Sequence, residues 1–259
     1  MNLTDSDVLK FQKGTPVFLE DICAIYPATL GQIVDEGYDN FQQYLSLLLS
    51  SKPDPQKADD KDFAKLLNEL NDFQYMLMMA TVDKDINSLL RKAFLFFTHE
   101  EINFSLDPAK IIIGPMNENH IIDEKKFLDF QRILRRMYFI DVEQEDIVIN
   151  DDDSDATKKL KKQMIANREK VRKAKAKQAA REGSDLKLSD LIGSLTINNC
   201  GLNMINIYNI TYYAFHDQLK RMGWRDQFNI NNQAALAGAK LKKSQMKHWM
   251  RSIANSDKS

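Results

Sequence analysis

Apolar residues recur along this chain at two spacings, and the change between them separates predicted strands from predicted helices. Short continuous or alternating apolar runs, here of three to five residues, are typical of strands. Asp107-Pro108 lies between two such runs and predicts the turn of a hairpin. The runs that predict strands are residues 16–19, 22–26, 102–106, 111–113 and 120–122.

Apolar residues three and four positions apart predict amphipathic helices over much of the remaining chain. Gly37 ends one predicted helix, and Asp123 provides an N-cap for another. Phe63 to Leu77 is predicted as a single helix. The predicted apolar stripes before residue 140 lie in residues 30–34, 41–48, 63–77, 86–97 and 127–137.

The stripes resume near the C-terminus. One lies in residues 188–195, and the most regular stripe in the chain runs from Tyr208 to Met222 and is predicted to end at Gly223. An Ala-rich piece follows at 233–239, and Ser244 can cap a last helix through Ile253. The predicted fold is therefore α+β and predominantly α-helical, with a small antiparallel sheet in the N-terminal part.

Charge along the chain sets the predicted domain boundaries. The formal net charge is only −1, from 36 basic and 37 acidic residues. However, residues 141–157 contain eight acids and no base, whereas residues 158–181 contain eleven bases and one acid. We therefore expect a mixed α+β domain at 1–140, an acidic-then-basic linker or solvated helix at 141–183, and a small all-α module at 184–259.

The basic stretch is a candidate contact for a polyanion, because clustered Lys and Arg release counterions from a nucleic-acid backbone. No base-reading module accompanies it, so a solvated helix or linker is the simpler interpretation. The candidate residues are Lys158, Lys159, Lys161, Lys162, Arg168, Lys170, Arg172, Lys173, Lys175, Lys177 and Arg181.

The sequence contains no catalytic motif, and we expect no enzyme, cofactor or metal site. Phosphate-binding glycine loops, a zincin motif and a nucleophile elbow are missing from the sequence. The adjacent ligands His99-Glu100-Glu101 point in different directions in regular structure. The pair His216-Asp217 is interpreted as a polar face opposite Tyr212 and Phe215.

Other classes are excluded on composition. No window has the 18 or so apolar residues of a membrane span, and the acidic N-terminus does not resemble a secretory signal. The two cysteines, Cys23 and Cys200, each lie in an apolar stretch and are expected to be buried thiols. We therefore expect a cytosolic protein with no membrane contact.

Six short stretches resemble phage tail assembly chaperones and related tail proteins of phages that infect Gram-positive bacteria. They are Asn206–Gln218, which includes Tyr208, Tyr212 and Phe215; Ala235–Lys240 with Lys247–Met250; and Pro16–Phe18 with Ile25–Leu30 and Phe41–Leu48.

The resemblance implies a non-enzymatic protein of the host cytoplasm that binds the tape measure protein, or the tail tube protein, and supports tail tube assembly. Homo-oligomerisation remains open. The alternatives are a structural virion component of the tail or neck, or a nucleic-acid-associated phage protein that uses the basic segment. The residues predicted to bind the partner are Tyr208, Tyr212, Phe215, Leu219, Met222, Met246 and Trp249.

Overall fold

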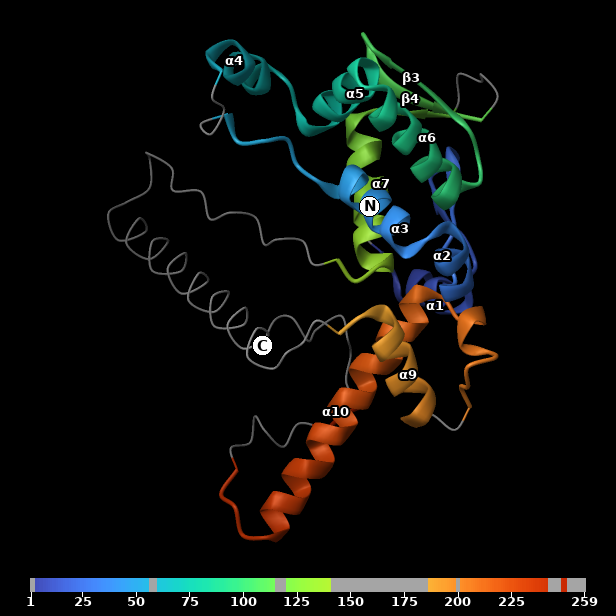
Figure 1. Ribbon diagram of the computed structural model, residues 1–259, viewed down its shortest axis with the longest axis vertical. Coiled ribbons are helices and arrows are strands. Elements are labelled where there is room, and N and C mark those ends of the chain that lie inside the picture. Colours follow the sequence, from blue (N-terminus) through green and yellow to red (C-terminus); the bar gives the residue numbers. More distant parts are fainter. Residues whose placement is uncertain are drawn as a thin grey trace, which may run out of the picture. The chain divides into compact units, whose positions relative to one another are not determined.

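The computed structural model describes residues 3–55, 60–114, 120–140, 186–198, 201–241 and 248–250 (Figure 1). Helices predominate, and two small antiparallel sheets accompany them, so the predicted α+β, mainly helical class is confirmed. The helices of the N-terminal part are α1 (Asp5–Lys13), α2 (Leu30–Glu36), α3 (Tyr38–Leu49), α4 (Lys61–Glu69), α5 (Asp72–Val82), α6 (Lys84–Thr98) and α7 (Glu124–Met137).

The strands lie where the short apolar runs predict them. β1 (Val17–Leu19) pairs with β2 (Cys23–Ile25) in a two-stranded hairpin. β3 (Ile102–Leu106), β4 (Ala109–Ile113) and β5 (Ile121–Ile122) form the second antiparallel sheet, with β4 in the centre. Helices α5, α6 and α7 all contact this sheet.

Helix α1 was not predicted, although local signals mark both of its ends. The Thr4 hydroxyl accepts from the Asp7 N–H at 3.3 Å, and the Asp7 carboxylate accepts from the Thr4 N–H at 2.9 Å. This reciprocal pair is a capping box. Gly14 ends the helix in the left-handed region, with a φ of 80°. A short charged helix of this kind carries too few apolar residues to show a clear stripe.

The single helix predicted from Phe63 to Leu77 is wrong, because the chain breaks at Leu70-Asn71 into α4 and α5. The Asn71 side chain accepts from the Gln74 N–H at 2.8 Å, while the Gln74 side chain accepts from the Asn71 N–H. The two reciprocal bonds start a new helix and turn its axis away from the old one. Apolar spacing alone does not detect such a break.

The core of the N-terminal part is rich in aromatic rings. Phe94 and Phe130 stack at 5.0 Å between ring centroids, which joins α6 to α7. Helix α7 also closes the end of α3: the Gln131 side-chain amide donates to the Leu48 carbonyl at 2.6 Å, and Arg135 donates to the Leu49 carbonyl at 2.8 Å. These two bonds satisfy carbonyls that the end of α3 leaves without helical partners.

The C-terminal elements are α9 (Leu188–Asn198), the 3-10 turn η2 (Ile207–Asn209) and α10 (Tyr212–Leu236). Helix α10 differs from its prediction, because it starts after Tyr208, continues through Gly223 and absorbs part of the Ala-rich piece. Gly223 has ample space and no positive φ, so it does not interrupt the helix. The helix predicted from Ser244 to Ile253 lies largely outside the described residues.

The contacts divide the chain into two compact units. Met1–Ile140 and Ile205–Ser259 form one unit, and Asp141–Met204 forms the other. This differs from the predicted module at 184–259, because η2 and α10 group with the N-terminal part. Helix α9 belongs to the second unit; of its predicted stripe, Ile192 and Leu195 are buried and Leu188 and Leu191 are half-buried.

Candidate interaction sites

The chain from residue 207 onward joins the N-terminal part through a short backbone pairing. Thr29 and Thr211 form an isolated antiparallel bridge. The Tyr212 N–H donates to the Ala28 carbonyl at 2.9 Å, and the Leu30 N–H donates to the Ile210 carbonyl at 3.0 Å. The two threonines therefore hold the start of α10 beside the start of α2.

Gly31 permits the close approach of η2 to α2. A Cβ atom built on Gly31 would lie 3.1 Å from the backbone carbonyl oxygen of Tyr208 and 3.7 Å from its Cβ. Such a distance to a backbone atom is tight, and the atom has little freedom to give way. We infer from this geometry that a glycine is needed here for packing and not for an unusual backbone angle.

We call the pairing of residues 28–30 with residues 210–212 the joint. Aromatic side chains pack around it on both sides of α10. Tyr213 lies 5.5 Å from Phe11 of α1 and stacks on Phe139 at 4.6 Å, measured between ring centroids. Tyr212 lies 5.5 Å from Phe41 and 5.7 Å from Tyr138. Ring pairs at these separations stabilise the fold beyond the contribution of the apolar surface that they bury. The first turns of α10 are thus part of the aromatic core.

This placement buries two of the residues that were predicted to bind the partner. Tyr212 and Phe215 are buried in the chain's own core, with 8% and 0% of their surfaces exposed. Their apolar surface is therefore not available to a partner while the unit is folded. Tyr208, Leu219, Met222 and Trp249 are half-buried, and Met246 lies outside the described residues.

The interpretation of His216-Asp217 as a polar face opposite the aromatic residues is wrong. The His216 ring lies 4.3 Å from Tyr212 and 5.8 Å from Phe139, so it shares the aromatic face. Its Nε2 atom is buried and has no hydrogen-bond partner among the described residues. Burial lowers the pKa of His216 to about 4. Asp217 instead pairs with Arg221 at 2.9 Å, so the two neighbours do not form a catalytic pair.

The second half of α10 has a different character. We call residues 223–236 the distal half of α10; none of them is buried, whereas four residues of the first two turns are. It carries large exposed apolar side chains, since Ile230 is 59% and Leu236 is 89% exposed. Helical spacing places Ile230 on the same side of the helix as Tyr212 and Leu219. The face that is buried near the joint therefore continues into a face that is open.

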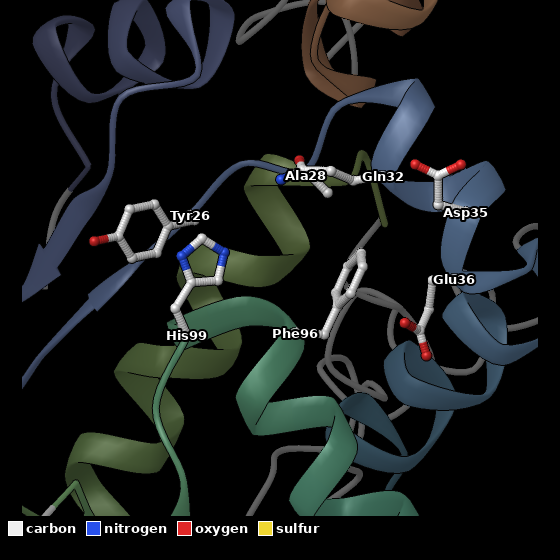
Figure 2. Close-up of a pocket in the computed structure, with 7 residues that line it drawn as sticks. All are labelled: Tyr26, Ala28, Gln32, Asp35, Glu36, Phe96 and His99. Carbon is white, nitrogen blue, oxygen red and sulfur yellow. The ribbon is translucent and has the colours of Figure 1, made fainter.

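A cavity of about 300 Å³ lies between α2 and the end of α6 (Figure 2). The sequence pattern does not predict this cavity. The Thr29-x-x-Gln32 capping box is visible in the sequence and marks the start of α2, but no local pattern shows that α6 ends opposite it. The residues that line the cavity are Tyr26, Ala28, Gln32, Asp35, Glu36, Phe96 and His99.

One wall of the cavity is a pair of stacked rings. Tyr26 and His99 lie 4.1 Å apart between ring centroids, at an interplanar angle of 17°. The backbone fixes both: the Tyr26 N–H donates to the Phe97 carbonyl at 2.8 Å, and His99 ends α6 with a left-handed φ of 61°. In the view of Figure 2, the Phe96 ring lies between this pair and the carboxylates of Asp35 and Glu36.

The opposite wall is acidic. The Tyr44 hydroxyl donates to Oε1 of Glu36, which fixes this carboxylate. Burial, together with the Glu36 carboxylate, raises the pKa of Tyr44 above its usual value. The seven lining residues include no Lys or Arg. The lining therefore combines aromatic faces with two acidic residues, whose carboxylates point in opposite directions in Figure 2.

The remaining sequence predictions concern the basic segment, the two cysteines, metal ligands and membrane spans. The basic residues of 158–181 lie outside the described residues. Cys23 is buried, as predicted, and burial raises the pKa of its thiol to about 12; Cys200 is not described. Among the described residues, no three His, Cys, Asp or Glu side chains gather in an arrangement suited to a metal ion. None of the described helices is both long and apolar enough to cross a membrane.

Comparison with known proteins gives one match. No curated protein and no solved structure matches the chain. Residues 175–254 match a family model described as YomV second domain. The matched range contains α9, η2 and α10, and the family name is associated with phages, so the match is consistent with a phage protein.

Proposed function

We propose that this chain is a non-enzymatic phage tail assembly protein, a chaperone that binds the tape measure protein and supports assembly of the tail tube. The observation that carries the proposal is the division of α10 into an anchored first half and an open distal half. The phage-associated match covers the whole of this helix. The resemblance of Asn206–Gln218 to tail assembly chaperones points to the same element.

The anchored half gives the distal half a rigid base. The bond from Tyr212 to Ala28, the adjoining bond from Leu30 to Ile210, and the ring contacts to Phe11 and Phe41 keep the first turns of α10 fixed in the core. A rigid, solvent-exposed helix with apolar side chains can pack against an amphipathic partner helix at little cost in ordering. A long helical tape measure protein presents such helices along its length.

The test is co-expression with the longest coiled-coil reading frame encoded beside this gene. The full chain is expected to increase the soluble fraction of that partner and to co-purify with it. Ile230→Asp is expected to reduce co-purification at least about tenfold, because it places a charge on the open continuation of the face that carries Tyr212 and Leu219. If the unaltered chain forms no complex, the proposal is wrong.

Val82→Asp is the matched control. Val82 is also a large exposed apolar residue, at 79%, but it lies at the end of α5. The substitution adds the same charge to an open apolar site and is expected to leave the complex intact. Equal loss of binding with Val82→Asp would show that general apolar exposure, and not the distal half of α10, drives the association.

The nucleic-acid alternative is supported by one observation, the balance of eleven bases against one acid in residues 158–181. Titration of a short duplex and a single strand at low and moderate salt tests it, since phosphate binding weakens steeply with salt. Binding at low salt that falls as salt rises would support this role, and no binding at low salt removes it. The structural alternative predicts the protein in purified virions, where a chaperone would be missing.

A further inference from the structure

We propose that the cavity between α2 and α6 binds a guanidinium group, the group carried by an arginine side chain. The inference is independent of the proposed function of α10, because it rests on different residues. Three properties of the cavity support it: its volume, its aromatic faces and its carboxylates.

The volume favours a small occupant. Sites for whole drug-sized molecules have volumes of about 300 to 1,000 Å³. At about 300 Å³ this cavity is at the lower limit of that range. It therefore suits one functional group at the end of a chain better than a nucleotide or a large cofactor.

The aromatic faces favour a cation. Phe96 is half-buried, and its other contacts, with Phe41, Tyr44 and Phe97, hold the ring in position. The stacked Tyr26–His99 pair provides a second flat surface. A cation within about 6 Å of a ring centroid is attracted by the negative face of the ring.

The carboxylates have the opposite charge and form no ion pair within the described part of the chain. Neither Asp35 nor Glu36 forms an ion pair with a described Lys or Arg. Asp35 and Glu36 are the two acidic residues of the lining, which contains no basic side chain other than His99. A cation that enters the cavity would therefore find negative charge that is not already neutralised.

A guanidinium fits this combination better than an ammonium. It is planar, it stacks on aromatic rings, and it can donate two parallel hydrogen bonds to one carboxylate. The ammonium of a lysine is a compact, strongly hydrated charge that lacks the planar face. The cavity offers ring faces and carboxylates together, so we expect it to discriminate between the two.

The experiment follows the backbone amides and the His99 ring of the isotopically labelled full chain by NMR. N-acetyl-arginine amide is titrated at low salt, beside the matched lysine and citrulline compounds. The arginine compound is expected to shift signals of the lining residues with a Kd on the order of 1 mM. Lysine should bind more weakly, and citrulline, which keeps the shape without the charge, should not bind. Equal responses to arginine and citrulline would overturn the proposal.

Variants locate the effect. Asp35→Asn is expected to weaken arginine binding about fivefold, and it preserves folding because Asp35 is exposed. Asp39→Asn is the matched control: it removes an exposed carboxylate from α3 that does not line the cavity. Phe96→Leu removes the aromatic face. Its melting temperature must equal that of the unaltered chain, so that a change in binding is due to the ring and not to unfolding. Equal weakening by Asp35→Asn and Asp39→Asn would show a diffuse charge effect and contradict the site.

Two sources could supply the guanidinium, and a last arm separates them. A short peptide with one central arginine is compared with the free arginine compound. Tighter binding of the peptide indicates an arginine of a partner protein, whereas binding of only the free compound indicates a small-molecule ligand. Either result supports the guanidinium site, and binding of neither excludes it.

Discussion

Thr29 and Thr211 are both helix N-caps, and they pair with each other. The Thr29 side chain accepts from the Gln32 N–H at the start of α2, and the Thr211 side chain accepts from the Ala214 N–H at the start of α10. Their backbones form an antiparallel bridge across 182 positions of sequence. Two helix starts are thus fixed to each other, and the C-terminal segment enters the N-terminal core at that point.

Thr211→Ala is expected to lower the free energy of unfolding by about 1 kcal/mol, because it removes the side-chain acceptor at the start of α10. Urea unfolding followed by far-ultraviolet circular dichroism measures the change. Ser50→Ala provides the control, since Ser50 is exposed at the other end of a helix and its hydroxyl makes only a long bond of 3.5 Å. Equal losses in the two variants would contradict the role of the cap.

Gly31→Ala and Gly223→Ala are expected to change stability in opposite directions. Alanine normally stabilises a helix by about 1 kcal/mol relative to glycine. At Gly223 nothing lies within 4 Å of the added Cβ, so the gain should appear. At Gly31 the Cβ meets the Tyr208 carbonyl oxygen at 3.1 Å, and a net loss of about 1 kcal/mol is expected.

Urea unfolding of both glycine variants, measured together, checks this prediction. The opposite sign is its distinctive feature, since both glycines lie in helices. A gain in both variants would mean that η2 does not pack closely on α2.

His216 is expected to make stability depend on pH. The imidazole has a pKa of about 4 in the folded chain and an ordinary value near 6.5 in the unfolded chain. As the pH falls below 6.5, the unfolded chain therefore binds the proton before the folded chain does. Protonation stabilises the unfolded chain and so lowers the free energy of unfolding. The contribution of neutral His216 is complete above pH 6.5 and is lost progressively down to pH 4. Between pH 7 and pH 5 we expect a loss of about 2 kcal/mol.

His216→Phe separates this effect from other titrations. Phenylalanine keeps the ring among Tyr212, Phe139 and Phe215 but cannot take up a proton. Chemical unfolding at pH 7, 6 and 5 should show a smaller slope in this variant. His248→Gln, at an exposed site, should keep the slope of the unaltered chain. A slope that persists in His216→Phe would assign the effect to another group.

The strands and most helices were predictable because they depend on local spacing and local caps. The hairpin at Asp107-Pro108 and the Asp123 cap of α7 are both where the sequence predicts them. The break at Asn71 and the helix after Thr4 were missed, although capping boxes mark both. In these two cases the signal was present but lay in polar residues.

The sites were less predictable, because they depend on contacts between distant segments. The sequence pattern of a regular aromatic stripe at Tyr212 and Phe215 is identical whether the stripe contacts a partner or the chain's own core. Its burial follows from Phe41 and Tyr138, which lie at least 74 positions away. The cavity likewise requires α2 and α6 to meet, and neither helix carries a motif that indicates the other.

Cys23 is expected to react slowly with a thiol reagent in the folded chain, because its thiol is buried and its pKa is raised to about 12. The Cys200→Ser variant leaves Cys23 as the only thiol. Reaction with an aromatic disulfide at pH 8 should be at least about 100-fold slower in buffer than in denaturant. Fast reaction in buffer would show that β2 opens readily.

The most direct test of the central claim is amide hydrogen exchange along α10, alone and in complex with the tape measure protein. In the free chain, residues 212–222 should be the most strongly protected, because they pack on α1 and α2, while residues 223–236, protected by helical hydrogen bonds alone, should exchange faster. In the complex, protection should increase in residues 223–236 and remain unchanged in 212–222. Uniform protection of free α10, or a complex that leaves the distal half unprotected, would contradict the account.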